Sequence, residues 1–206
     1  MNKVYVIGMG PGTTDYLLPA AKIEIEKADC LIGAERLLSL FSYQDKKKIR
    51  LEGHFKEAIS YIKKNKDREK IAVLVSGDPG LYSFLDAVRT ALKKGEYAVI
   101  PGISTLQLAF AKIGESWQDA RIVSIHGRGI GNLTRELKSS DKVFLFTDME
   151  FPPEKIANYL LHNGIKNRRA IVFEALTYPN ERIVDTDLKA LSNKKRFGLC
   201  AMIIKK

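Results

Sequence analysis

Residues 4–12 read Val-Tyr-Val-Ile-Gly-Met-Gly-Pro-Gly, an apolar run that ends in a loop of glycine and proline. A short apolar run before such a loop is typical of a buried strand followed by a sharp turn. The pattern recurs where Ile71–Val75 precedes residues 76–83, and where Tyr97–Ile100 precedes Pro101. Because helically spaced segments separate these runs, the sequence predicts an α/β fold with a largely parallel sheet covered by helices.

The alternation pauses around residues 114–119 and then resumes with a second set of strands and helices. The predicted strands of this second set are Arg121–Ile125, Val143–Phe146 and Ala170–Phe173, followed by a less regular C-terminal part. We therefore predict two α/β domains, residues 1–113 and 120–206, each a sheet covered by helices.

The composition is that of a globular protein rather than a membrane or disordered one. The chain has 206 residues, of which 45% are hydrophobic, so it can bury a substantial core. No apolar run approaches the roughly 20 residues that span a bilayer. The strand begins at Val4, which leaves no room for a secretory signal. We therefore expect a soluble, cytoplasmic protein with no membrane partner.

The net charge of +10 admits two interpretations. One is a lysine-rich, solvated surface, and the other is a polyanionic partner such as nucleic acid or a polycarboxylate. No basic motif interleaved with aromatic residues is visible, so we do not expect nucleic acid. The two cysteines lie in apolar stretches and the three histidines lack ligand spacing, so we predict no protein-bound metal.

The first glycine loop, residues 8–12, differs from a dinucleotide fingerprint. Thr13 occupies the position of the third glycine, and Pro11 has no backbone N–H for a phosphate cradle. The loop is either a simple strand-to-helix turn or a place where backbone approaches a ligand that has no pyrophosphate.

The second and third loops carry polar side chains. In residues 76–83, Gly77 permits close approach and Asp78 can accept hydrogen bonds from hydroxyl or amino groups, although Asp and Pro also suit a plain turn. We expect Asp78 to lie at a loop tip and to matter for binding rather than for folding. In the third loop, Ser104 and Thr105 can cap the next helix or bind a ligand from that place.

In order and spacing, the three loops resemble those of the tetrapyrrole (corrin/porphyrin) methylase family. More narrowly, the chain resembles the branch that methylates C5 of cobalt-precorrin-7, through residues 32–38, 106–120 and 124–128. The resemblance implies a two-domain α/β enzyme with its active site in the cleft between the domains. It also implies a homodimer, S-adenosylmethionine as methyl donor, and a tetrapyrrole polycarboxylate in cobalamin biosynthesis as substrate. Because some relatives are fused to a C15-methylating, decarboxylating domain, a separate protein of that kind is a candidate partner.

The resemblance places donor contacts on eight residues: Pro11, Gly77, Asp78, Leu81, Ser104, Thr105, Thr147 and Leu176. Candidates for substrate contact are Trp117, Asp119, His126, Arg128 and Asp148, each of which could instead be a core, surface, cap or turn residue. Arg128 is attractive because Arg pairs bidentately with carboxylates. The sequence identifies no catalytic acid or base.

Rival functions remain open at this point. A C11 or C4 precorrin methylase would differ only in regiochemistry. An RNA methylase of the same fold would suit the net charge, and a non-catalytic nucleotide-binding module could use the first glycine loop. The sequence does not say whether the substrate contains cobalt.

Overall fold

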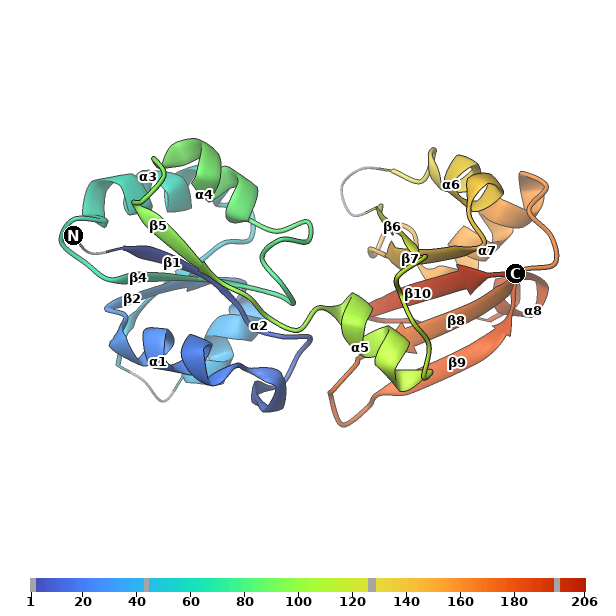
Figure 1. Ribbon diagram of the computed structural model, residues 1–206, viewed down its shortest axis with the longest axis horizontal. Coiled ribbons are helices and arrows are strands. Elements are labelled where there is room, and N and C mark those ends of the chain that lie inside the picture. Colours follow the sequence, from blue (N-terminus) through green and yellow to red (C-terminus); the bar gives the residue numbers. More distant parts are fainter. Residues whose placement is uncertain (1–2, 43–44, 126–128, 195–196) are drawn as a thin grey trace. The chain divides into compact units, whose positions relative to one another are not determined.

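The computed structural model describes residues 3–42, 45–125, 129–194 and 197–206, and it divides into two units, Met1–Ser104 and Thr105–Lys206 (Figure 1). The predicted boundary at residues 114–119 therefore differs from the observed one by the helix α5, Thr105–Lys112. The reason is packing: the Phe110 ring contacts Phe144 of the second unit, with 6.3 Å between centroids, and Lys112 forms a 2.6 Å ion pair with Glu181.

The first unit is built on a five-stranded sheet of order β3-β2-β4-β1-β5 in which every pairing is parallel. This confirms the predicted parallel sheet for the N-terminal half. The strands are β1 Val4–Gly8, β2 Cys30–Gly33, β3 Lys47–Arg50, β4 Ile71–Val75 and β5 Tyr97–Ile100.

Helices cover both faces of this sheet, with α1 and α2 on one face and α3 and α4 on the other (Figure 1). Along β4, Ile71, Val73 and Val75 pack toward α3 and α4, whereas Ala72 and Leu74 pack toward α1 and α2. Such a fully buried strand reads as a continuous apolar run rather than an alternating one. The helices are α1 Pro19–Lys27, α2 Glu35–Leu38, α3 Phe55–Asn65 and α4 Leu85–Ala91.

Two segments of different type follow the first glycine loop. Thr14–Tyr16 form a 3-10 turn, and α1 begins at Pro19. Proline suits the first helical position because its fixed φ matches the helix and its missing N–H would have no partner there.

The second unit holds a mixed sheet of order β6-β7-β10-β8-β9, unlike the parallel sheet of the first unit. Only β6 and β7 are parallel; β10 runs antiparallel to β7 and β8, and β8 is antiparallel to β9. The physical reason is the short turn between β8 and β9, which allows only antiparallel pairing. The strands are β6 Arg121–Ser124, β7 Lys142–Phe146, β8 Arg169–Glu174, β9 Arg182–Asp187 and β10 Cys200–Lys205.

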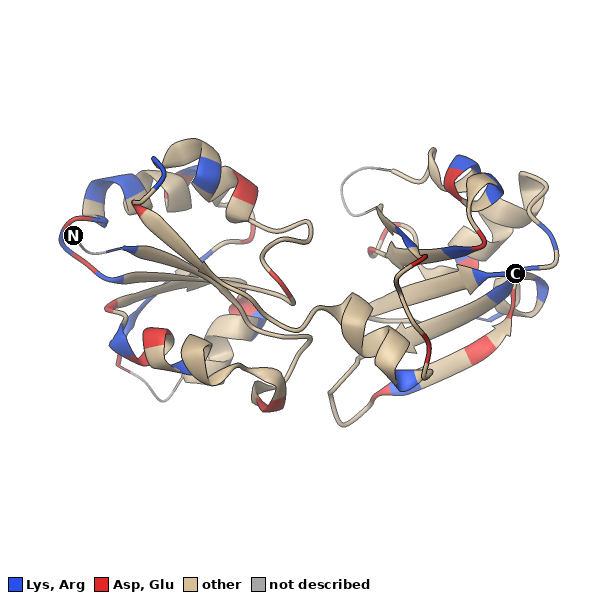
Figure 2. Ribbon diagram, in the orientation of Figure 1, with Lys and Arg blue, Asp and Glu red and all other residues tan. Residues whose placement is uncertain are grey.

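Helices α6 Leu133–Ser139, α7 Pro153–His162 and α8 Leu188–Ser192 pack on one face of this second sheet. No helix among the described residues is long and apolar enough to cross a membrane. Lys and Arg are spread over the helices and strand ends of both units rather than gathered on one element (Figure 2). Several are ion-paired, among them Arg121 with Glu136 and Lys66 with Glu96.

Candidate functional site

Three loops of the first unit meet at one edge of its sheet. β1 lies between β4 and β5 and is parallel to both, so the loops that follow these three strands leave the sheet side by side. These are the three glycine loops that the sequence singled out. The carboxyl edge of a parallel sheet is where ligands bind in open α/β folds.

Glycine backbones hold the three loops in contact. A β-carbon at Gly102 would lie 2.3 Å from the carbonyl oxygen of Gly77 and 2.8 Å from the Gly8 backbone. A β-carbon at Gly8 would lie 2.5 Å from the Gly102 nitrogen. Because these neighbours are backbone atoms, no side chain fits at Gly8 or Gly102 unless the loops separate.

Backbone amides of the first two loops bond to each other. Gly10 N–H donates to Gly77 O at 3.3 Å and Gly77 N–H donates to Gly10 O at 2.8 Å, while Met9 N–H donates to Val75 O at 2.9 Å. Pro11 has no N–H to offer. Amides that are already bonded within the protein cannot cradle a phosphate, so this arrangement disfavours a dinucleotide.

Asp78 ties the second loop to the third. Its Oδ2 accepts the N–H of Gly102 at 3.1 Å, and its Oδ1 accepts the N–H of Gly80 at 2.7 Å. This bond argues against the expectation that Asp78 matters for binding rather than for folding, because the carboxylate satisfies the amide of the buried Gly102. Each carboxylate oxygen has a second lone pair, so Asp78 can still accept from a ligand.

The other donor candidates of the first unit surround the same loops. Pro11 is buried, Leu81 is half-buried with its N–H bonded to the carbonyl of Asp78 at 3.1 Å, and Ser104 is buried at the end of the third loop. Thr105, the next residue and the first of the second unit, begins α5 and is half-buried. The structure thus places the first-unit candidates on the loops that follow β1, β4 and β5.

In the second unit, Thr147 and Leu176 follow β7 and β8 at the edge of the sheet where β10 begins. The hydroxyl of Thr147 donates to the Cys200 carbonyl at 2.6 Å. Leu176 is buried between two residues with left-handed backbone, Ala175 at φ 48° and Thr177 at φ 72°. Such conformations cost about 1–3 kcal/mol each and persist where the surroundings hold them, often at functional sites.

The candidates for substrate contact do not gather at one place. Asp148 lies at the Thr147 edge, where its Oδ1 accepts the N–H of Phe151 at 2.8 Å as a turn residue would. Trp117 and Asp119 precede β6 and therefore lie at the opposite edge of that sheet. Trp117 is 44% exposed and its carbonyl accepts the N–H of Ala120. His126 and Arg128 lie outside the described residues.

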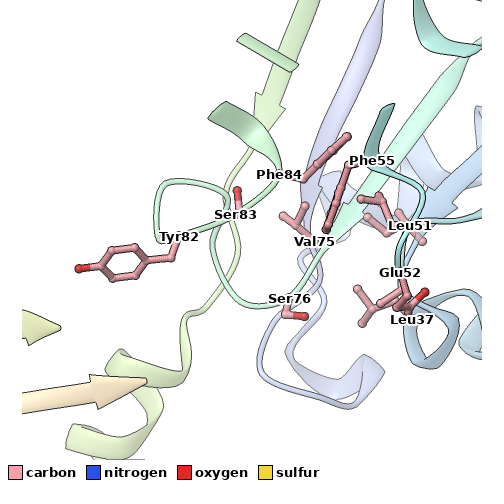
Figure 3. A pocket seen from close by; sticks show the side chains of 11 residues that line it. Leu37, Leu51, Glu52, Phe55, Val75, Ser76, Tyr82, Ser83 and Phe84 are labelled. Atoms are coloured by element: carbon pink, nitrogen blue, oxygen red, sulfur yellow. The ribbon is translucent and has the colours of Figure 1, made fainter. Parts of the chain in front are cut away.

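Sequence reasoning missed a pocket beside the second loop. It has a volume of about 230 Å³ and lies between the ends of β2 and β4, with Phe55, Phe84 and Leu51 in its wall and Ser76 at its rim (Figure 3). Arg36 is the residue in the sequence that could have pointed to this pocket. It lies within residues 32–38, which carry the resemblance to the C5 branch, and its guanidinium donates to the hydroxyl of Ser76 at the pocket rim.

Cys200, at the start of β10, is not an activated nucleophile. Burial raises the pKa of the Cys200 thiol to about 11, so the reactive thiolate is scarce at neutral pH. Among the residues that the structure describes, no group of three His, Cys, Asp or Glu side chains is placed to hold a metal ion.

Comparison with known proteins identifies the relatives of this chain. The model of the tetrapyrrole (corrin/porphyrin) methylases matches residues 3–192. A probable cobalt-precorrin-7 C(5)-methyltransferase of Methanocaldococcus jannaschii is 37% identical over 202 residues, covering 92% of each chain. The cobalt-precorrin-7 C(5)-methyltransferase of Salmonella typhimurium is 33% identical over 86% of this chain and 87% of its own.

A solved structure shares the fold at lower sequence identity. The uroporphyrin-III C-methyltransferase of Thermus thermophilus, complexed with S-adenosylhomocysteine, superposes with a TM-score of 0.78 at 19% identity. The match covers 98% of this chain and 92% of that chain.

Proposed function

Because the chain belongs to the tetrapyrrole (corrin/porphyrin) methylase family, we propose that it methylates C5 of a precorrin-7-type intermediate in cobalamin biosynthesis. The observation that carries this proposal is the 37% identity to a protein of that name, over 92% of both chains. The enzyme is a C-methyltransferase, and we place its work in the cytoplasm.

S-adenosylmethionine is the proposed donor, and the first unit fits it. Gly8 and Gly102 let the backbones of the three loops touch at the sheet edge, and this contact sets the spacing of the loops that carry the donor candidates. Asp78 offers carboxylate oxygens to hydroxyl or amino groups at the same edge. When bound, the donor supplies a methyl group on a cationic sulfur. Thr147 and Leu176 of the second unit stay candidates for further donor contact.

The electron-rich macrocycle supplies the nucleophilic carbon itself, so the reaction needs no protein nucleophile. The protein's task is to hold the sulfur, the methyl group and the acceptor carbon in line, with the methyl group about 3–3.5 Å from the acceptor carbon, and to exclude water. A proton must leave the methylated carbon or a neighbouring position afterwards, and no residue is assigned to accept it. Arg128 remains a candidate for pairing with a substrate carboxylate.

Product analysis tests the proposal. The purified chain, incubated with S-adenosylmethionine and precorrin-7 with or without cobalt, should give a product one methyl group heavier. NMR of that product should show the new methyl at C5. A methyl at C11 or C4 would assign the chain to another branch of the family, and no transfer to any precorrin would refute the proposal. If the chain binds NAD but neither S-adenosylmethionine nor S-adenosylhomocysteine, the proposed cofactor is contradicted.

The proposal extends to assembly. We propose a homodimer, and as a partner a separate protein that methylates C15 and decarboxylates the C5-methylated product. Sedimentation of the purified chain tests the first, and product consumption by a candidate C15 enzyme tests the second.

A further inference from the structure

The pocket beside the second loop combines an aromatic wall with a polar rim. Phe55 and Phe84 stack with 5.6 Å between ring centroids and 28° between planes, and they stand beside Val75 (Figure 3). Phe55 is 57% exposed although it is large and apolar. Such a wall offers its faces to a flat, apolar group.

Arg36 lies at the Ser76 end of this pocket. Its guanidinium donates to the Ser76 hydroxyl, which leaves most of its five N–H donors for another acceptor. No carboxylate of the described residues forms an ion pair with Arg36, whereas the nearby Arg50 is paired with Glu35. The hydrogen bond to Ser76 therefore holds the guanidinium of Arg36 beside the rim of the pocket.

Glu52 lines the same pocket and constrains what can enter. Its Oε1 accepts the backbone N–H of Glu35 at 2.8 Å, which fixes the carboxylate in place. A negatively charged group is therefore repelled at Glu52 and attracted at Arg36. One cation and one fixed anion beside the same small pocket can select a single orientation of an acidic ligand.

The volume limits how much of a ligand fits. Pockets that enclose a whole drug-sized molecule hold roughly 300–1,000 Å³, and this one holds about 230 Å³. The pocket can therefore take one edge of a large flat molecule, with an acidic side chain reaching Arg36. It opens beside the loop that carries Asp78, so such a molecule would extend toward the loop cluster.

We propose that Arg36 binds one carboxylate side chain of the tetrapyrrole while the ring that bears it packs on Phe55 and Phe84. Arg36 is then a residue that determines specificity by setting the orientation of the macrocycle. This inference rests on the proposed function for the identity of its ligand.

The test uses Arg36→Gln, which removes the charge but can keep a hydrogen bond to Ser76, and Arg36→Lys, which keeps the charge without the planar fork. The matched control is Arg89→Gln, which removes from α4 an exposed charge that pairs with the exposed Asp86. Binding is followed by fluorescence with uroporphyrin, a polycarboxylate porphyrin, and with its methyl ester. Kinetics are measured separately with precorrin-7.

Arg36→Gln should weaken uroporphyrin binding, and raise the KM for precorrin-7, by about ten- to a hundredfold, as loss of a charged hydrogen bond predicts. Arg36→Lys should fall between wild type and Arg36→Gln. Donor affinity should not change, the control should match wild type, and the ester should bind wild type and Arg36→Gln alike.

The outcomes separate the two proposals. If uroporphyrin binding depends on Arg36 but C5 is not methylated, the proposed function fails and the Arg36 site stands. If C5 is methylated and Arg36→Gln changes neither porphyrin affinity nor KM, the Arg36 site is overturned. Absence of porphyrin binding to the wild type, with an unchanged KM in the variant, overturns it as well.

Discussion

Replacing Asp78 with alanine should lower both stability and donor affinity, because this carboxylate joins the loops that follow β4 and β5. The substitution removes the acceptor for Gly102 N–H, at 3.1 Å, and for Gly80 N–H, at 2.7 Å. Gly80 is exposed and can bond to water instead, whereas Gly102 is buried. The cost therefore comes mainly from Gly102.

A buried donor left without a partner costs about 1–3 kcal/mol, and we expect Asp78→Ala to lower the free energy of unfolding by that amount. Donor affinity should fall by roughly ten- to a hundredfold, since the loops lose their fixed spacing together with a carboxylate acceptor. Asp78→Asn keeps one acceptor oxygen and loses the charge, so its effects should be smaller.

Urea unfolding and calorimetric titration with S-adenosylhomocysteine measure the two quantities on the same samples. Asp86→Ala serves as the control, because Asp86 lies exposed on α4 and pairs only with the exposed Arg89. An unchanged free energy of unfolding in Asp78→Ala would refute the role of the hydrogen bond to Gly102. A destabilised variant whose folded fraction binds the donor normally would refute the link between loop spacing and the donor site.

Three further predictions concern other parts of the chain. Gly102→Ala should abolish donor binding in calorimetry, since its β-carbon would clash with backbone, whereas Gly131→Ala, with nothing within 4 Å, should bind as wild type. The hydrogen bond and the charge of Lys205 lower the pKa of the Glu115 carboxyl below its ordinary value of 4.5. The ion pair therefore stabilises the folded protein above pH 4.5, and this stabilisation is lost as the pH falls through the lowered pKa. In urea unfolding, the free energy of unfolding of Glu115→Gln should therefore fall less below pH 4.5 than that of the wild type. An equal dependence of this free energy on pH in the two proteins would contradict the pairing. Burial raises the pKa of Cys200 to about 11, so iodoacetamide should alkylate it at pH 8 far more slowly in the folded protein than in urea, and equal rates measured by mass spectrometry would disprove its protection.

The sequence predicted the first sheet well where strands are buried and poorly where they are not. β4 appears as the apolar run Ile71–Val75 because helices cover both its faces. β3 reads Lys-Lys-Ile-Arg over residues 47–50, which has no apolar run to mark it as a strand. It is an edge strand that pairs only with β2 among the described strands, and charged side chains are tolerated there because they face water.

Of the candidate site, the loops were predictable and the bonds between them were not. Glycine and proline in sequence mark a turn, so the three loops could be placed after their strands. That Asp78 bonds to Gly102, 24 residues away, depends on the order of β4, β1 and β5 in the sheet. Trp117 was grouped with the substrate candidates by likeness of sequence, but it precedes β6 and so lies at the other end of that strand from Ser124.

The backbone contacts between Gly8, Gly77 and Gly102 also bear on how this chain can change over generations. Because the loops touch through main-chain atoms, Asp78 is the loop side chain on which we expect their spacing to depend. Mutations at loop positions other than Asp78 and the donor candidates can therefore accumulate without changing that spacing. At Gly8 and Gly102 any replacement adds a β-carbon where backbone already stands, so these two positions should be closed to substitution while their neighbours diverge.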